Sequence, residues 1–187
     1  MCPRKGIMST YAWSLLTDRE FLLKMNHPCP IEHILEPNEI QWNKQIEEKK
    51  LVKTDKYYIY WDPDYMNKLK YIDLIGLSQE ADLIEVRSGG LFLNKLSENK
   101  KLYTKIKQLG YEPKKFKLHF LMFEWYNKLF KLTHKLKLEF ETYLNQIKGK
   151  TLICAQIRIG RKKASSGLVD DFFTSRNETV KFWSLIK

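Results

Sequence analysis

The sequence predicts an α/β fold in which a largely parallel sheet is covered by helices. Short β-prone segments alternate with longer segments of helical apolar spacing, and clusters of Gly and Pro separate them. Such alternation is typical of βαβ units, in which consecutive strands run parallel. The 187 residues, of which 43% are apolar, are enough to bury the core of one domain. We therefore expect residues 1–187 to form a single domain.

The amino-terminal part of the chain is expected to hold a helix, a strand and a helical turn, over residues 6–17, 21–25 and 31–35. The helix is predicted from apolar residues at helical spacing, among them Ile7, Tyr11 and Leu15. The strand is a short apolar run that ends before Pro28. The first helix is therefore the best supported of the three elements.

The middle of the chain is expected to form a strand–helix–strand unit. The strands are predicted over 57–61 and 83–87, and the helix over 65–73, after an irregular segment at 38–56. Aromatic and β-branched residues favour the strands. Pro63 follows Asp62 just before the helix, and a proline at this place is typical of a helix start.

Residues 91–147 are expected to be helical, with a break near Gly110. A wide apolar stripe runs through 116–147. We predict that this stripe packs inside the protein, rather than forming a membrane or partner surface. The helical region, about 91–148, is then an insertion in the α/β domain, and Gly149 is expected to end its last helix.

The feature that bears most on function is an apolar strand, predicted over 151–157, that leads to Arg158 and a turn at Gly160. Arginine is rarely buried without a partner, and its guanidinium forms paired hydrogen bonds with phosphate oxygens. Ligands of open α/β sheets bind just outside the carboxyl ends of the strands. Arg158 is therefore well placed to hold an anion. The alternative is an ion pair with Asp170 or Asp171.

Residues 156–160, Gln-Ile-Arg-Ile-Gly, resemble the His-x-Arg-x-Gly/Thr motif of the fucosyltransferase superfamily. This superfamily includes the α1,2-, α1,6- and protein O-fucosyltransferases. Residues 6–19 resemble the first helix of the group, and residues 170–183 resemble the segment that follows the motif in fucosyltransferase-like proteins. The resemblance thus covers most of the chain, whereas one short motif in it carries chemistry.

The resemblance implies the Rossmann-like amino-terminal half of a GT-B glycosyltransferase. It implies that fucose passes from GDP-fucose to a hydroxyl of a glycan or protein acceptor, with inversion and without a metal or other cofactor. Arg158 would be the catalytic residue, because it would grip the diphosphate and stabilise charge on the leaving GDP. Gln156 and Gly160 would bind substrate beside it. Relatives of this type act in the secretory pathway, in the ER or Golgi.

Two features depart from the family pattern. A strand and a Gly-x-Gly-Asp-Arg loop usually precede the first helix, whereas this chain starts at Met1, so we expect the first strand of the sheet to be missing. Gln156 stands where many members have His, and glutamine does not titrate near neutral pH. These departures favour an alternative, a catalytically inactive, truncated copy with a binding or structural role.

The net charge of +11 comes mostly from lysines. Such a balance attracts phosphates, nucleic acid or acidic surfaces, so a basic interaction module is a weaker alternative. No nucleic-acid motif accompanies the charge, and the helical spacing of the lysines indicates solvated helix faces. We therefore expect no nucleic-acid partner. The sequence also contains no apolar run of transmembrane length.

The cysteines and histidines do not predict a disulfide framework or a metal site. The three cysteines are Cys2, Cys29 and Cys154, an odd number without a disulfide spacing pattern. Cys29 is expected to be a free thiol, with pairing to another chain as the alternative. The four histidines show no metal-ligand spacing, so we predict no metal.

Overall fold

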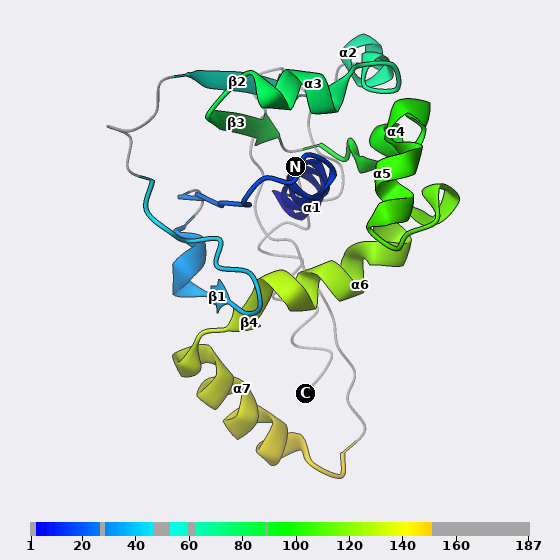
Figure 1. Cartoon of the computed structure of the whole chain (residues 1–187). Coiled ribbons are helices and arrows are strands. Elements are labelled where there is room, and N and C mark those ends of the chain that lie inside the picture. Colours follow the sequence, from blue (N-terminus) through cyan, green and yellow to red (C-terminus); the bar gives the residue numbers. More distant parts are fainter. Residues whose placement is uncertain (1–2, 27–28, 47–52, 60–62, 89, 151–187) are drawn as a thin grey trace, which may run out of the picture. The chain divides into compact units, whose positions relative to one another are not determined.

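The computed structural model describes residues 3–26, 29–46, 53–59, 63–88 and 90–150 (Figure 1). Within these ranges the fold is mixed α/β, with many helices and two small sheets. The chain divides into two compact units, Met1–Glu139 and Phe140–Lys187. The α/β class predicted from the sequence is therefore confirmed.

Helix α1 (Pro3–Leu16) forms the centre of the first unit and confirms the predicted first helix. Its buried residues include Met8, Tyr11 and Leu16, which lie at the i, i+3 and i+8 positions of one helical face. The helix contacts β3 (Leu83–Ser88), α4 (Leu93–Ser97) and α6 (Leu118–Leu129). The core of the unit is therefore built around α1.

Strands β2 (Thr54–Ile59) and β3 run parallel, in a register that pairs Thr54 with Leu83. The helices α2 (Pro63–Lys68) and α3 (Leu74–Gln79) lie between them in the chain, so the four elements form the strand–helix–strand unit that the sequence predicts. The second of these helices was not expected. The Asp73 side chain caps it, because it accepts a hydrogen bond from the Gly76 N–H at 3.1 Å.

The two faces of the β2–β3 pair differ in chemistry. On the inner face, the Tyr57 ring packs against Trp13 of α1 with a centroid distance of 5.1 Å. On the outer face, Glu85 pairs with Lys56 at 3.5 Å and with Arg87 at 2.6 Å. A two-stranded sheet is marginally stable by itself, so the packing against α1 on the apolar face is what stabilises it.

The second sheet is a short antiparallel pair that the sequence did not predict. Strand β1 (Leu35–Pro37) follows a 3₁₀ turn, η1 (Ile31–His33), and pairs with β4 (Phe130–Leu132). Strand β4 interrupts the region expected to be helical, directly after α6. The expectation of uninterrupted helix after the break near Gly110 is therefore wrong at this point.

The strand expected over 21–25 is also wrong. This segment joins no sheet; instead the Leu23 N–H donates to the Trp42 carbonyl oxygen at 2.8 Å, and the Met25 carbonyl accepts from the Ile31 N–H at 3.0 Å. Phe21 is nevertheless buried and packs edge-on against Tyr11. The apolar run thus serves the core without the regular ladder of bonds that defines a strand.

The remaining helices follow β3. Helix α4 is followed by the 3₁₀ turn η3 (Lys100–Leu102) and by α5 (Tyr103–Gln108). Another 3₁₀ turn, η4 (Pro113–Lys115), precedes α6. Helix α7 (His134–Ile147) follows β4. Gly110 has a φ of 83°, and it ends α5 where the sequence predicts the break. Gly149, with a φ of 77°, follows α7 as expected.

Candidate functional site

The residues predicted to carry the chemistry lie outside the described ranges. These residues are Gln156, Arg158 and Gly160, together with the two carboxylates considered as ion-pair partners, Asp170 and Asp171. Cys29, by contrast, is described and is a free thiol of intermediate exposure. Three other candidate sites lie within the described residues.

The turn after β3 is the first candidate, because Gly-rich turns between a strand and a helix can bind anions through their N–H groups. Here the Gly90 N–H donates to the Ser88 hydroxyl oxygen at 3.1 Å. The N–H groups of Phe92 and Leu93 both donate to the Ser9 hydroxyl oxygen, each at 3.1 Å. Because these three donors have partners within the chain, the turn has a structural role in joining β3 to α4.

Ser9 is the residue that organises this turn. It is fully buried in α1, and its hydroxyl donates to the Lys5 carbonyl at 2.8 Å while it accepts from the two N–H groups of the α4 start. A buried hydroxyl needs such partners, since an unpaired one costs about 1–3 kcal/mol. Ser9 therefore connects α1 to α4. The geometry of the turn is explained by these internal hydrogen bonds, without a bound phosphate.

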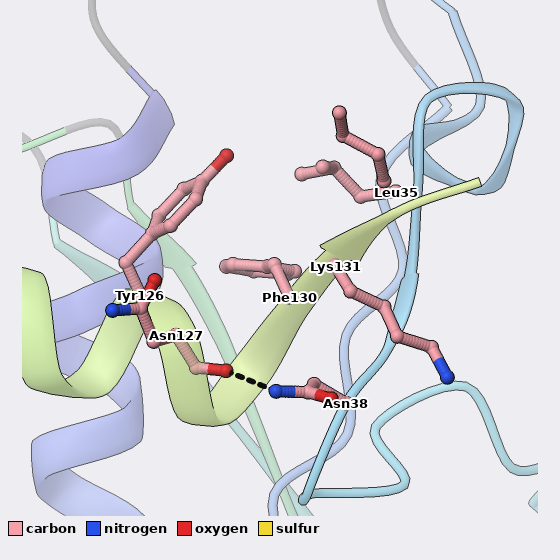
Figure 2. Close-up of a pocket in the computed structure, with 7 residues that line it drawn as sticks. Leu35, Asn38, Tyr126, Asn127, Phe130 and Lys131 are labelled. Atoms are coloured by element: carbon pink, nitrogen blue, oxygen red, sulfur yellow. Dashed lines mark hydrogen bonds between the residues drawn. The ribbon is translucent and has the colours of Figure 1, made fainter. Parts of the chain in front are cut away.

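The second candidate is an open pocket of about 410 Å³ beside the β1–β4 sheet (Figure 2). Its walls come from β1 and the residue that follows it, from the end of α6, and from β4. The lining residues are Leu35, Asn38, Tyr126, Asn127, Phe130, Lys131 and Leu132. The pocket therefore exists only because β1 and β4 are paired.

Aromatic and aliphatic side chains form the inner part of this pocket. Phe130 is 5% exposed, and its ring lies 5.2 Å from the Tyr126 ring, at an angle of 55°. Figure 2 shows Tyr126 and Leu35 on opposite sides of the Phe130 ring. Phe130 also packs edge-on against Trp42, which is fully buried. The Phe130 ring, which lies between Tyr126 and Leu35, is thus held in place by its packing against the core.

Polar groups lie at the edge of the pocket. The Asn38 side-chain amide donates to the Asn127 main-chain carbonyl oxygen at 2.7 Å (Figure 2). The Asn38 N–H donates to the Leu129 carbonyl oxygen at 3.2 Å. Lys131 lies opposite Glu36 in the β1–β4 register, and its ammonium is 3.5 Å from the carboxylate. The polar edge therefore has one carboxamide, that of Asn38, held by a hydrogen bond, and a positive charge that is paired with Glu36.

Sequence reasoning missed all the residues of this pocket. One local feature was available, because Phe130, Lys131 and Leu132 alternate apolar and polar residues as a strand does. That alternation is too short to outweigh the helical spacing on both sides. The partner strand is far away in sequence, so no local pattern indicates the pairing.

A third group of polar residues joins α6 to the chain before it. The Trp125 indole N–H donates to the Tyr111 hydroxyl at 3.0 Å, which in turn donates to a Glu124 carboxylate oxygen at 2.9 Å; Lys128 donates to the same oxygen at 2.7 Å. The Lys128 hydrogen bond lowers the pKa of Glu124, and burial raises the pKa of Tyr111. Each group has a partner, so this network stabilises structure and is a poor candidate for catalysis.

The described residues hold no group of three or more His, Cys, Asp or Glu side chains arranged to bind a metal ion. In the same ranges, the helices are all too short or too polar to cross a membrane. Comparison with protein-family models, with curated proteins and with solved structures found no match.

Proposed function

We propose that this chain is a fucosyltransferase-like protein that binds the diphosphate of GDP-fucose through Arg158. The observation that carries the proposal is the segment in which an apolar run leads through Gln156 to Arg158 and Gly160. An arginine at the end of a buried strand offers a fixed pair of donors to phosphate oxygens. The positive charge of the chain favours an anionic ligand as well.

The parallel β2–β3 pair, with α2 and α3 between its strands, supports this proposal at the level of fold. Strand–helix–strand units of this kind build the Rossmann-like domains of GT-B glycosyltransferases, the architecture we propose for the chain. Fold alone does not define an activity. The proposal therefore depends on the motif at Arg158.

In the proposed reaction, the bond between C1 of fucose and the β-phosphate oxygen breaks as the acceptor oxygen bonds to C1 from the opposite face. The electron pair of the broken bond stays on GDP, where the Arg158 guanidinium stabilises the developing negative charge. Gln156 can orient a substrate oxygen by a hydrogen bond, but its amide does not take up a proton near neutral pH. The proton of the acceptor hydroxyl therefore passes to another base or to water.

Isothermal titration of the full chain with GDP and with GDP-fucose tests the proposal. Arg158→Ala should weaken both affinities at least tenfold, and Arg158→Lys should recover only part of the loss, because an ammonium lacks the paired donors. Arg161→Ala, three residues away, is the matched control for general loss of positive charge. Equal affinities for the Arg158→Ala and wild-type chains would refute the role of Arg158.

Gln156 favours a second candidate, a protein that binds the sugar nucleotide without transferring the sugar. This candidate predicts GDP-fucose binding in the titration, together with no release of GDP in the presence of an acceptor panel. Gln156→His would restore a titratable group at the position where many members of the family have one. GDP release by the wild-type chain would exclude this candidate.

A further inference from the structure

We infer that the pocket beside the β1–β4 sheet binds a neutral sugar ring. The inference rests on the residues of the pocket itself and does not require the proposed role of Arg158. The pocket volume of about 410 Å³ lies in the range of small-ligand sites. Its mixed lining, apolar within and polar at the edge, is also what such sites have in common.

The apolar part of the pocket suits one face of a pyranose ring. A pyranose presents C–H groups on its faces and hydroxyl groups around its edge, so an aromatic side chain can cover a face while polar groups contact the edge. Tyr126 is half-buried, and its contact with the 5% exposed Phe130 holds its ring in place. A ring that is already ordered loses little conformational entropy when a ligand binds.

The polar edge of the pocket matches sugar hydroxyl groups, which both donate and accept hydrogen bonds. Asn127 and Asn38 are exposed side chains, and a carboxamide carries both donors and acceptors. The Asn38 amide is positioned by its bond to the Asn127 main-chain oxygen. The Asn38 carboxamide therefore offers a donor and an acceptor in a defined place, and Asn127 adds a second exposed carboxamide beside it.

The charge of the pocket argues for a neutral ligand. Lys131 is the cationic residue of the lining, and its ammonium lies 3.5 Å from the Glu36 carboxylate across the β1–β4 pair. The two opposite charges offset each other, so the edge of the pocket has little net charge to attract a phosphate or carboxylate. An uncharged sugar does not depend on such an attraction.

Saturation-transfer difference NMR on the full chain tests this inference, with methyl β-glucoside, methyl β-galactoside and methyl α-mannoside as probes. N-acetylleucine amide serves as an apolar comparison ligand. We expect at least one glycoside to bind in the millimolar range, with the strongest saturation on its C–H protons. The absence of transfer to all three glycosides, or stronger binding of the leucine derivative, would overturn the inference.

Two variants and one control locate the binding. Tyr126→Ala should weaken glycoside binding at least fivefold, because it removes the stacking surface. Asn127→Ala should also weaken it, yet it keeps the Asn38 hydrogen bond, since the acceptor there is a main-chain oxygen. Phe123→Ala is the matched control on the same helix, where the side chain is 82% exposed and outside the pocket lining.

The variants also separate this inference from the proposed function. Tyr126→Ala should leave GDP affinity unchanged, whereas Arg158→Ala should leave glycoside affinity unchanged. Glycoside binding that survives both Tyr126→Ala and Asn127→Ala would place the sugar elsewhere and overturn the assignment. Circular dichroism spectra equal to that of the wild-type chain establish that each variant is folded.

Discussion

Helices α6 and α7 are both amphipathic, but they differ in how far their side chains are buried. Both carry a stripe of aromatic and aliphatic residues, and the sequence predicts one continuous packing surface over the two. In α6, the residues Leu121, Trp125 and Leu129 are buried. In α7, which has 14 residues, no side chain is buried, and Phe140 is 52% exposed. An apolar stripe therefore predicts a helix, but it does not predict that the stripe is covered.

The difference follows from what lies next to each helix. The buried residues of α6 recur every four positions, and α6 contacts α1. Trp125 is fully buried and packs edge-on against both Tyr11 of α1 and Phe116. None of the residues of the described core belongs to α7. The same amphipathic pattern thus contributes to the described core in one helix and does not contribute to it in the other.

The largest expected effect comes from truncating one aromatic residue in each helix. Trp125→Ala should lower the free energy of unfolding by about 3–5 kcal/mol, because it leaves a cavity and removes one of the two hydrogen bonds of the Tyr111 hydroxyl. Phe140→Ala should change it by less than about 0.5 kcal/mol, as is usual for exposed positions. Urea unfolding followed by far-ultraviolet circular dichroism measures both values.

Two further variants keep this comparison interpretable. If Trp125→Ala does not fold, Trp125→Phe still removes the indole donor and part of the volume, with a smaller loss of stability. Phe123→Ala, on the exposed face of α6, should behave like Phe140→Ala. A loss of more than about 2 kcal/mol for Phe140→Ala would mean that α7 is part of a packed core after all.

An intermediate effect is expected at the glycines that end α5 and α7. Gly110 and Gly149 both have positive φ, and neither has an atom within 4 Å of an added Cβ, so the cost of alanine lies in the backbone alone. After α5, the Tyr111 N–H donates to the Ile106 carbonyl at 3.1 Å, which ties the turn to the buried end of that helix.

The helix that Gly110 ends has a buried residue, Ile106, whereas no residue of α7 is buried. Gly110→Ala should therefore lower the unfolding free energy by about 1 kcal/mol. Gly149→Ala should reduce helix content slightly and leave the urea midpoint unchanged, since α7 is outside the described core. Urea titrations and helix content from circular dichroism distinguish the two. Equal losses of stability would contradict the contrast between the helices.

The smallest expected effect is the pH dependence of the Glu124–Lys128 pair on α6. The folded-state pKa of Glu124 is lowered from its ordinary value of 4.5, mainly by the hydrogen bond from Lys128. Its stabilising contribution is therefore full above about pH 4.5 and is lost as the pH falls through the lower folded-state pKa. The pair is partly exposed, so the contribution is below about 1 kcal/mol.

Glu124→Gln should flatten the loss of stability between about pH 5 and pH 3, the interval around the ordinary pKa of a glutamate. Lys128→Met should flatten it to a similar extent, because it removes the donor that lowers the pKa of Glu124. Urea midpoints measured across this interval provide the test. If the urea midpoint falls as steeply with decreasing pH in both variants as in the wild-type chain, the loss of stability belongs to other carboxylates.

Much of the local structure was predictable from residues a few positions apart. The apolar spacing around Tyr11 predicted α1, and the break at Gly110 followed from a residue that tolerates positive φ. The β-prone segments predicted β2 and β3 within a few residues of their observed bounds. By contrast, the apolar run at 21–25 was predicted as a strand, because propensity does not show whether a partner strand is available.

The two proposed sites also differ in how far the sequence could predict them. The motif at Arg158 is a local pattern, and it remains a proposal because it lies outside the described residues. The pocket near Tyr126 needed the β1–β4 pairing, and its polar edge joins Asn38 to Asn127, which are 89 residues apart. Local sequence patterns do not report contacts between such distant segments.

The sequence by itself determined the α/β class, the position of α1 and the parallel strand–helix–strand unit, since short-range spacing and backbone preferences control these features. Only the tertiary structure decided which apolar helix face is covered, that β1 pairs with β4, and that a pocket forms beside them. The physical reason is that burial and strand pairing depend on which distant segments meet, and a side chain of given polarity is compatible with either outcome.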